Sequence, residues 1–254
     1  MRRHPALFVF VARAPEPGAT KTRLGATIGM TAAADLYRAF LRDLAARFTP
    51  AAGADPGYDF GWAHTPAEVD FRQILIDLGC APPPSVRFVP QCGAGLAARL
   101  DNVFHWAAAE GYERAVIAAS DSPQLPRSAA AAAVAALADH ELVLGRTFDG
   151  GYYLIGVRGT PDVLAGAPMS TGREADALVA RAACLGLRTA ELPATFDVDV
   201  AADLALLAAA LAPNGCAAPA TWDALRRLRP SWPQDESRVS AAPAGGDKIP
   251  LPDI

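Results

Sequence analysis

Short runs of uninterrupted apolar, β-prone residues alternate with longer segments of helical hydrophobic spacing along most of this chain. The clearest runs are residues 7–11 (LFVFV) and 114–119 (RAVIAA). Strands without polar alternation are typical of parallel sheets that helices cover on both faces. Strands that alternate with helices are joined by right-handed crossovers. The pattern therefore predicts an α/β fold, with a mostly parallel, Rossmann-like sheet sandwiched by helices.

The same signals predict the other elements. Further strands are expected over residues 58–63, 86–89, 141–144, 151–157 and 187–192. Helices are expected over residues 31–48, 67–78, 95–110, 128–138, 173–185, 201–211 and 222–228. Thr31 is the expected N-cap of the first helix, because its hydroxyl can accept a hydrogen bond from a backbone N–H of the first turn. The alternation is interrupted where two strands follow each other, near residues 141–157.

Composition limits the class of protein. The 254 residues are 52% hydrophobic and 20% charged, which is too apolar for a disordered chain and sufficient for a buried core. The 23 Lys and Arg against 27 Asp and Glu give a net charge of −4, which argues against a nucleic-acid partner. From Pro230 onward the sequence loses its periodicity. We expect one domain over residues 1–232 and a disordered tail over residues 233–254.

The cysteines and the apolar runs indicate a cellular compartment. Cys80, Cys92, Cys184 and Cys216 have no metal-binding spacing and fit reduced thiols. The first apolar run is too short for a membrane span and is followed too soon by charge for a signal peptide. A cytoplasmic protein without a membrane span is therefore expected.

A basic loop, residues 13–23 (RAPEPGATKTR), directly follows the first strand. Ligands of open parallel sheets bind at the carboxyl ends of the strands, where this loop lies. Gly18 allows close backbone approach, and Arg13, Lys21 and Arg23 can together hold a diphosphate. The spacing matches neither the P-loop nor the dinucleotide-binding fingerprint. The alternative interpretation is a solvated basic loop without a ligand.

Carboxylates follow two other expected strands. Asp121 lies at the end of the apolar run 114–119, where an oxygen ligand could hold Mg²⁺ or Mn²⁺. Asp197 and Asp199, two residues apart in an extended stretch, point the same way and could complete such a metal site. The alternatives are an ordinary turn at Asp121 and a helix N-cap at Asp199.

The segment FDGGYY, residues 148–153, combines a carboxylate with two glycines and two phenols. Gly150 and Gly151 allow the backbone to approach a ligand closely, and Asp149 and Tyr152 offer polar groups. Asp-Gly is also a common hairpin turn, and both interpretations can hold together.

Taken together, these segments resemble one family. They are PxPGxxKTRL after the first strand, QxGxxLxxRL at a helix start, SDSP, DGGYYLIG and DVD. The chain resembles, over about residues 6–211, the DUF2064 family of glycosyltransferase-like proteins with the GT-A (nucleotide-diphospho-sugar transferase) fold. The resemblance implies a nucleotide over the ends of the first strands and a divalent metal, Mg²⁺ or Mn²⁺, on the Asp of the central strand.

The resemblance also implies residue roles. The expected nucleotide and phosphate contacts are Arg13, Pro17, Gly18, Lys21, Thr22, Arg23, Gln91, Gly93 and Arg99. The expected metal ligands are Asp121, Asp197 and Asp199. The acceptor side would be lined by Gly150, Gly151 and Tyr152. Asp149, as general base or acceptor-orienting group, and Lys21 are the expected catalytic residues.

The chain departs from the family pattern at several positions. Ser122 replaces a cysteine of the SDSP turn, Phe148 replaces an acidic residue before DGG, and Met169 and Val200 also differ. The leading expectation is a metal-dependent glycosyltransferase that uses a nucleotide-diphospho-sugar donor and a small-molecule acceptor. One alternative is a nucleotidyltransferase that joins an NTP to a phosphorylated acceptor, since KTRL also resembles the phosphate loop of phospholactate guanylyltransferases. Another is a non-catalytic nucleotide-binding domain.

Overall fold

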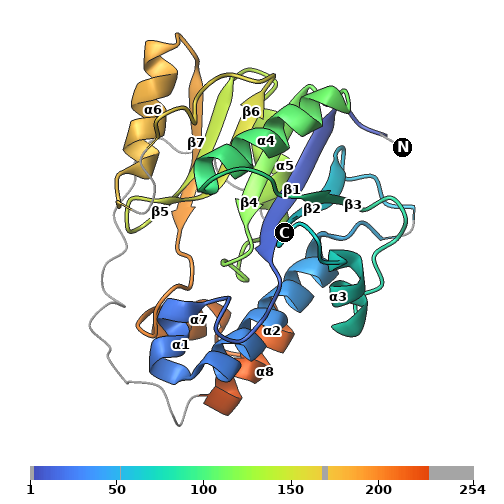
Figure 1. The fold of residues 1–254 in the computed structure, drawn as a ribbon, viewed down its shortest axis with the longest axis vertical. Coiled ribbons are helices and arrows are strands. Elements are labelled where there is room, and N and C mark those ends of the chain that lie inside the picture. The colour runs from blue at the N-terminus through green and yellow to red at the C-terminus, as the bar shows by residue number, and fades with distance from the viewer. Residues whose placement is uncertain (1–2, 52, 168–170, 229–254) are drawn as a thin grey trace.

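The computed structural model describes residues 3–51, 53–167 and 171–228, and its strands and helices alternate as expected (Figure 1). The strands are β1 Ala6–Arg13, β2 Asp59–Thr65, β3 Arg87–Pro90, β4 Arg114–Ala119, β5 Leu142–Thr147, β6 Tyr152–Arg158 and β7 Thr189–Thr195. The helices are α1 Thr22–Ile28, α2 Met30–Phe48, α3 Phe71–Asp77, α4 Leu96–Ala109, α5 Arg127–Ala136, α6 Glu174–Cys184, α7 Asp203–Leu211 and α8 Pro219–Leu228. The expected tail, 233–254, and the departure at Met169 lie outside the described residues.

The strands form one seven-stranded sheet in the order β3-β2-β1-β4-β6-β5-β7. Strand β6 runs antiparallel to its neighbours β4 and β5, whereas the other pairs are parallel. The expectation of a mostly parallel sheet is confirmed. The one reversal falls where the alternation of strands and helices is interrupted, because β5 and β6 are joined by a hairpin.

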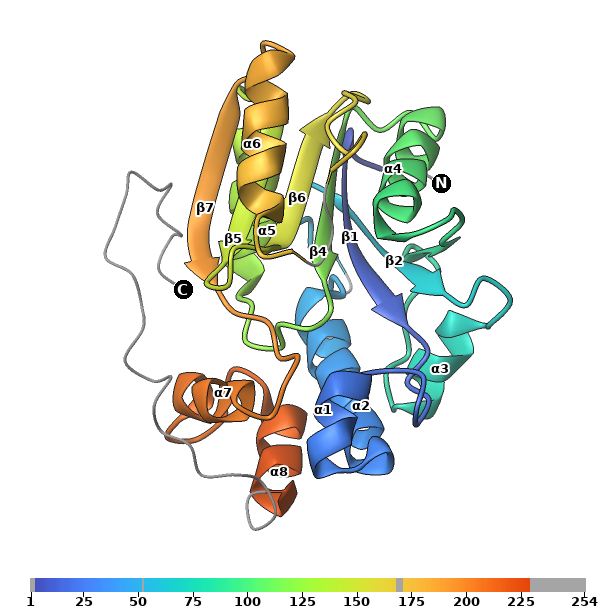
Figure 2. The same cartoon turned by 60° about the vertical axis from the view of Figure 1, so that its left-hand side comes forward.

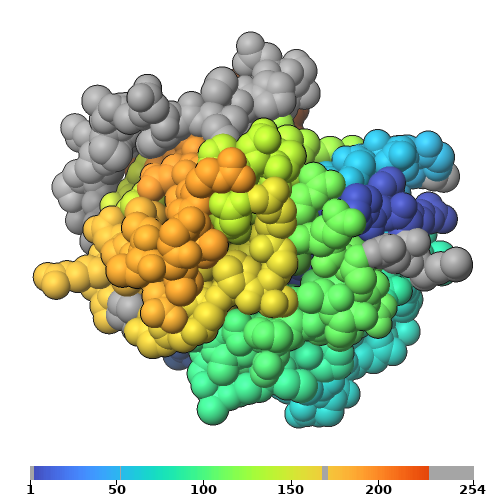
Figure 3. Space-filling model, turned by 90° about the horizontal axis from the view of Figure 1, so that it is seen from above, coloured from blue at the N-terminus to red at the C-terminus, as the bar shows by residue number. Residues whose placement is uncertain are grey.

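Strand β1 shows how the sheet divides the core. Phe8 and Phe10 belong to a core that also takes the apolar faces of α2, α5, α7 and α8. Leu7 and Val9 face the other way, into a second core with α4 and α6. Figure 2 shows these helical layers on the two faces, and Figure 3 shows the surface of the molecule from above. In the described ranges, no helix combines the length and apolarity needed to cross a bilayer.

Two expectations about the first helices are wrong. Residues 22–28 form helix α1 instead of the end of a loop, and Thr31 lies inside α2 rather than capping it. Gly29 joins the two helices with φ 93°, a conformation that glycine adopts without the steric cost of a side chain. The turn therefore begins α2 one residue before Thr31, with no side-chain cap.

Glu141, just before β5, gives a prediction about acid stability. Its carboxylate accepts hydrogen bonds from the backbone N–H of Arg188 at 3.0 Å and from the Arg188 guanidinium at 2.9 Å, and it pairs with Arg158. These contacts, those of Arg188 foremost, lower the pKa of Glu141 from 4.5 to about 2. A lowered pKa stabilises the folded state above the unfolded-state value, and this stability is lost as the pH falls towards the folded-state value.

Glu141→Gln is therefore expected to lower the free energy of unfolding at pH 7, and this loss should shrink between pH 4.5 and about 2. Urea unfolding of wild type and variant at pH 7 and at pH 3 measures it. Asp162→Asn is the control, because it removes the exposed ion pair between Asp162 and Arg181. This variant should lose less stability than Glu141→Gln at pH 7. A loss from Glu141→Gln of equal size at both pH values would contradict the prediction.

Candidate active site

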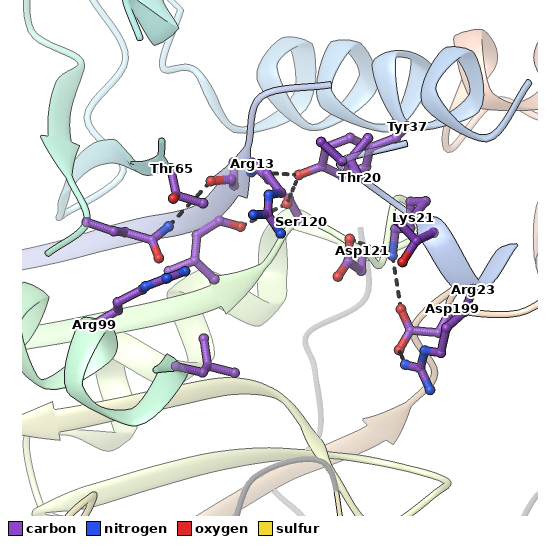
Figure 4. Close-up of a pocket in the computed structure, with 16 residues that line it drawn as sticks. Arg13, Thr20, Lys21, Arg23, Tyr37, Thr65, Arg99, Ser120, Asp121 and Asp199 are labelled. Atoms are coloured by element: carbon purple, nitrogen blue, oxygen red, sulfur yellow. Dashed lines mark hydrogen bonds and ion pairs between the residues drawn. The ribbon is translucent and has the colours of Figure 1, made fainter. Parts of the chain in front are cut away.

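A cleft of about 320 Å³ opens at the carboxyl ends of β1, β2 and β4, beside the segment that follows β7 (Figure 4). The predicted site residues that line it are Arg13, Lys21, Thr22, Arg23, Gln91, Arg99, Asp121 and Asp199. Segments far apart in sequence meet here because the chain returns to this edge of the sheet after each parallel strand. The cleft lies at the edge of the sheet where the sequence predicts a ligand.

The other predicted residues are not among those lining the cleft. Within the described part of the chain they are Pro17, Gly18, Gly93, Asp149, Gly150, Gly151, Tyr152 and Asp197. Pro17 and Gly18 lie on the exposed part of the basic loop. Asp149 to Tyr152 lie at the hairpin between β5 and β6, on the other side of the sheet's midpoint. The glycine-rich hairpin therefore does not line the basic cleft.

Lys21 lies at the centre of the acidic part of the cleft. Its Nζ is 2.7 Å from Asp121 Oδ1 and 3.2 Å from Asp199 Oδ1, and it donates to the carbonyl oxygen of Val198 at 2.7 Å. The side chain is only 5% exposed. Burial alone would lower the pKa of Lys21, but Asp121 and Asp199 outweigh it and raise the pKa. Lys21 is therefore a charged group that pairs with both carboxylates.

The backbone around Lys21 is as unusual as its side chain. Lys21 has φ 48°, and within the described ranges it is the one non-glycine residue with a positive φ. It precedes the first turn of α1, so the left-handed conformation turns the chain from the basic loop into that helix. A non-glycine residue held in this region costs stability and often marks a functional site.

Asp199 is held by both its side chain and its backbone. Its carboxylate pairs with Arg23 as well as with Lys21. The carboxylate of Asp203 accepts hydrogen bonds from the N–H groups of Asp199 at 2.9 Å and Val200 at 2.8 Å. The interpretation of Asp199 as an N-cap of α7 is wrong, since its side chain turns to the cleft (Figure 4).

The three expected metal ligands are not gathered into one ligand cluster. Within the described part of the chain, no group of three or more His, Cys, Asp or Glu side chains is arranged to hold a metal ion. The reason is that the Lys21 ammonium lies between Asp121 and Asp199. Asp197 is nearby and mostly buried, and burial together with Asp199, Asp121 and Asp149 raises its pKa to about 7. Negative charge thus exceeds positive charge on this side of the cleft.

Tyr37 and Ser120 form a buried link that the sequence did not indicate. The Tyr37 hydroxyl accepts a hydrogen bond from the Arg13 N–H at 3.1 Å and lies 2.7 Å from Ser120 Oγ. Ser120 Oγ in turn donates to the carbonyl oxygen of Val11 at 2.8 Å. This series of hydrogen bonds ties α2 to the ends of β1 and β4. Tyr37 lies on the apolar face of α2. In the sequence, a single phenol among the aliphatic residues of that face was the one sign that it could belong to the site.

Arg99 lies at the opposite end of the cleft from Lys21 (Figure 4), and Gln91 also lines the cleft. Gln91 is buried, and its side-chain amide donates to the carbonyl oxygen of Ala63 at 2.7 Å. Arg99, in the first turn of α4, lies on the same side as Arg13. The cleft therefore carries Arg13 and Arg99 at one end and Lys21 and Arg23 at the other.

The hairpin between β5 and β6 confirms the turn interpretation of the Asp-Gly pair. Gly150 N–H donates to the Thr147 carbonyl oxygen at 3.2 Å, and Asp149 Oδ1 accepts from the Thr147 hydroxyl at 2.6 Å. Gly150 has φ 90°, and a Cβ there would lie 2.1 Å from the carbonyl oxygen of Gly172. Gly150 thus allows two backbone segments to pack closely.

Comparison with known proteins shows what this chain is similar to. Residues 64–171 match the family described as uncharacterized protein conserved in bacteria (DUF2064). The chain has a structure similar to that of a protein from Desulfovibrio desulfuricans G20, with a TM-score of 0.78 and 29% identity. That protein is provisionally named a nucleotide-diphospho-sugar transferase. That similarity covers 90% of this chain and 99% of the other. No curated protein sequence matches the chain.

More distant structures share the fold alone. A cytidylyltransferase from Leptospira borgpetersenii has a TM-score of 0.53 at 14% identity, covering 90% of this chain and 95% of its own. A 4-diphosphocytidyl-2C-methyl-D-erythritol synthase from Anaerococcus prevotii has a TM-score of 0.50 at 10% identity, covering 82% of this chain and 100% of its own. The expected resemblance and the expected fold, similar to nucleotide-diphospho-sugar transferases, are both confirmed.

Proposed function

We propose that this chain, whose residues 64–171 match the DUF2064 family, transfers a glycosyl group from a nucleotide-diphospho-sugar to a small-molecule acceptor. One observation carries the proposal: the cleft at the carboxyl ends of β1 and β4 has cations at both ends and carboxylates beside them. Such a site suits a diphosphate, which guanidinium forks and a lysine can hold from two sides. The similarity to the Desulfovibrio protein supports a nucleotide-diphospho-sugar as the donor.

The residues of the cleft divide into two groups. Arg13 and Arg99 bind the donor at one end, while Lys21 and Arg23 meet the diphosphate at the other. As the glycosyl bond breaks, negative charge grows on the departing nucleoside diphosphate. Fixed cations stabilise that charge more strongly in a partly closed site than in water. Lys21 exchanges its contact with Asp121 for one with phosphate, which makes it the cation closest to the chemistry.

As they stand, the carboxylates in the described part of the chain form no metal site, because the Lys21 ammonium lies between Asp121 and Asp199. Once Lys21 contacts phosphate, Asp121, Asp197 and Asp199 would be free to hold Mg²⁺ or Mn²⁺, since both ions prefer oxygen ligands. The observation behind this is that three carboxylates meet only Lys21 and Arg23 among the described residues on this side of the cleft. When bound, the ion would supply further neutralisation of the leaving diphosphate.

Asp149 acts on the acceptor side. It is exposed at the tip of the β5–β6 hairpin, and its orientation is fixed by the Thr147 hydroxyl. A carboxylate so placed orients an acceptor hydroxyl and takes its proton during attack. Gly150, Gly151 and Tyr152 form the backbone beside it. The four cysteines are free thiols, which supports action in the reducing cytoplasm.

A thermal-shift screen tests the proposal. UDP-, GDP- and dTDP-sugars and the NTPs are added with Mn²⁺, since a ligand of the native state raises the unfolding temperature. We expect stabilisation by at least one sugar nucleotide, lost in Arg99→Gln and retained in Arg38→Gln, which removes an ion pair with Asp35 on α2, outside the lining of the cleft. Stabilisation by NTPs alone would favour nucleotidyl transfer. Binding of neither class would contradict both enzymatic interpretations.

A further inference from the structure

An aromatic pair, exposed at Phe148 and half-buried at Phe196, lies beside the carboxylates on the β5–β7 side of the site. Phe148, the first residue after β5, is 44% exposed. Its ring centroid is 6.4 Å from that of Phe196, the first residue after β7, and the two ring planes are 31° apart. The Phe148 N–H donates to the carbonyl oxygen of Thr195 at 3.0 Å. The two segments that carry the rings are therefore fixed relative to each other.

Folding alone does not explain an aromatic residue at position 148. The residue belongs to a tight turn, where glycine and small polar residues are preferred. A phenylalanine that stays 44% exposed also gains only part of the stabilisation available from burying its ring. Phe196 is firmly held, since its carbonyl oxygen accepts hydrogen bonds from Ser122 at 2.9 Å and Gln124 at 2.7 Å. The pair thus presents apolar surface to solvent from a rigid support.

Each ring is followed in sequence by a carboxylate. Asp149 follows Phe148 and is exposed, and Asp197 follows Phe196. Throughout residues 3–51, 53–167 and 171–228, neither carboxylate forms an ion pair with Lys, Arg or His. Carboxylates accept hydrogen bonds from hydroxyl groups and repel other anions. An apolar ring surface beside carboxylates therefore suits a neutral ligand with hydroxyl groups.

We propose that Phe148 and Phe196 form a stacking platform for the acceptor, and that the acceptor is an uncharged hydroxylated ring, a sugar or a cyclic polyol. The C–H face of the ring packs on Phe148, and its hydroxyl groups donate to Asp149. A phosphorylated acceptor is disfavoured by the two carboxylates. This inference rests on the proposed function, because it assigns the acceptor of the same site.

Saturation-transfer NMR tests the inference with defined probes. Methyl α-D-glucopyranoside and myo-inositol represent hydroxylated rings, sorbitol an acyclic polyol, and glucose 6-phosphate a charged ring. Each is added to wild type, Phe148→Ser, Phe148→Trp and the control Leu185→Ser. Leu185 is also exposed, at 39%, but lies beyond α6 at the other end of the molecule. Unfolding temperatures of the variants confirm that all of them fold.

We expect saturation of the ring probes by wild type, about fivefold weaker in Phe148→Ser, retained in Phe148→Trp and unchanged in Leu185→Ser. Sorbitol and glucose 6-phosphate should give weaker signals than the glucoside. Equal signals from sorbitol, stronger signals from the phosphate, or no effect of Phe148→Ser would overturn the inference. Nucleotide binding by wild type is measured separately. If it is absent the proposed function fails, and if it is present without ring binding only the platform fails.

Discussion

Replacing Lys21 by Met is expected to lower the free energy of unfolding at pH 8 by about 3 kcal/mol, since it leaves the partly buried Asp121 without its cation and Asp199 with Arg23 alone. Asp121 and Asp199 both lie within 3.2 Å of the Lys21 ammonium, which is almost completely buried. Methionine keeps the length of the side chain and removes only the charge and its hydrogen bonds. Urea unfolding at pH 8 measures the loss.

The pH dependence of this loss follows from the charges. Lys21 is the charge that lowers the otherwise raised pKa of the nearby Asp197, so removing it raises that pKa further above the unfolded-state value. A raised carboxylate pKa destabilises the folded state above the unfolded-state pKa, and this cost disappears as the pH falls below it. The deficit of Lys21→Met should therefore be smaller at pH 5 than at pH 8.

Arg23→Met is the matched control for Lys21→Met. Among the described residues Arg23 pairs with Asp199 alone, and its side chain is 70% exposed. Exposed ion pairs contribute little, so this variant should lose less than about 1 kcal/mol. Both variants should weaken binding of a sugar nucleotide, because both cations meet the diphosphate. Equal losses of stability in the two variants would show that Lys21 is not the central cation of the site.

Replacing Gly150 by Ala is expected to cost about 3 kcal/mol or more, the sum of a strained backbone and a steric overlap. The φ of Gly150 is 90°, and the added Cβ would lie 2.1 Å from the Gly172 carbonyl oxygen. Backbone cannot move aside as a flexible side chain can. The hairpin and the segment before α6 must therefore separate. Thermal and urea unfolding measure the effect.

Gly159→Ala is the control for this overlap. Gly159 also has a positive φ, 72°, but a Cβ there meets nothing within 4 Å. This variant should lose about 1 kcal/mol of unfolding free energy, because an alanine at positive φ is strained but meets no steric overlap here. If Gly150→Ala and Gly159→Ala lose equal stability, close packing against Gly172 does not explain the glycine.

The strands and their order of appearance could be predicted because burial on both faces leaves a direct trace in the sequence. Residues 114–119, for example, form strand β4 as expected. Helix α1 was missed because TRLGATI contains a glycine and two threonines, which weaken the local preference for a helix. Its conformation depends on Lys21 and Gly29, whose positive φ values bound the helix at either end.

The site was only partly predictable, for a physical reason. The sequence shows which charged residues follow which strands, and parallel topology brings those positions to one edge. It does not show which charges will pair once they meet. Lys21 and Asp199 are 178 residues apart, and their contact depends on the whole fold. Tyr37 was missed because a phenol on an apolar helix face is usually a core residue.

Hydrogen–deuterium exchange with and without the best-stabilising sugar nucleotide, in the presence of Mn²⁺, tests most directly whether the basic cleft holds the donor. We predict slower exchange in residues 14–28 and 91–99, which border the cleft. A second, larger cavity of about 810 Å³ is lined by Tyr58, Cys80 and Arg127 and lies away from the cleft. The backbone amides around it should exchange at an unchanged rate. Slower exchange around that cavity, with unchanged exchange in residues 14–28, would contradict the claim that the basic cleft holds the donor.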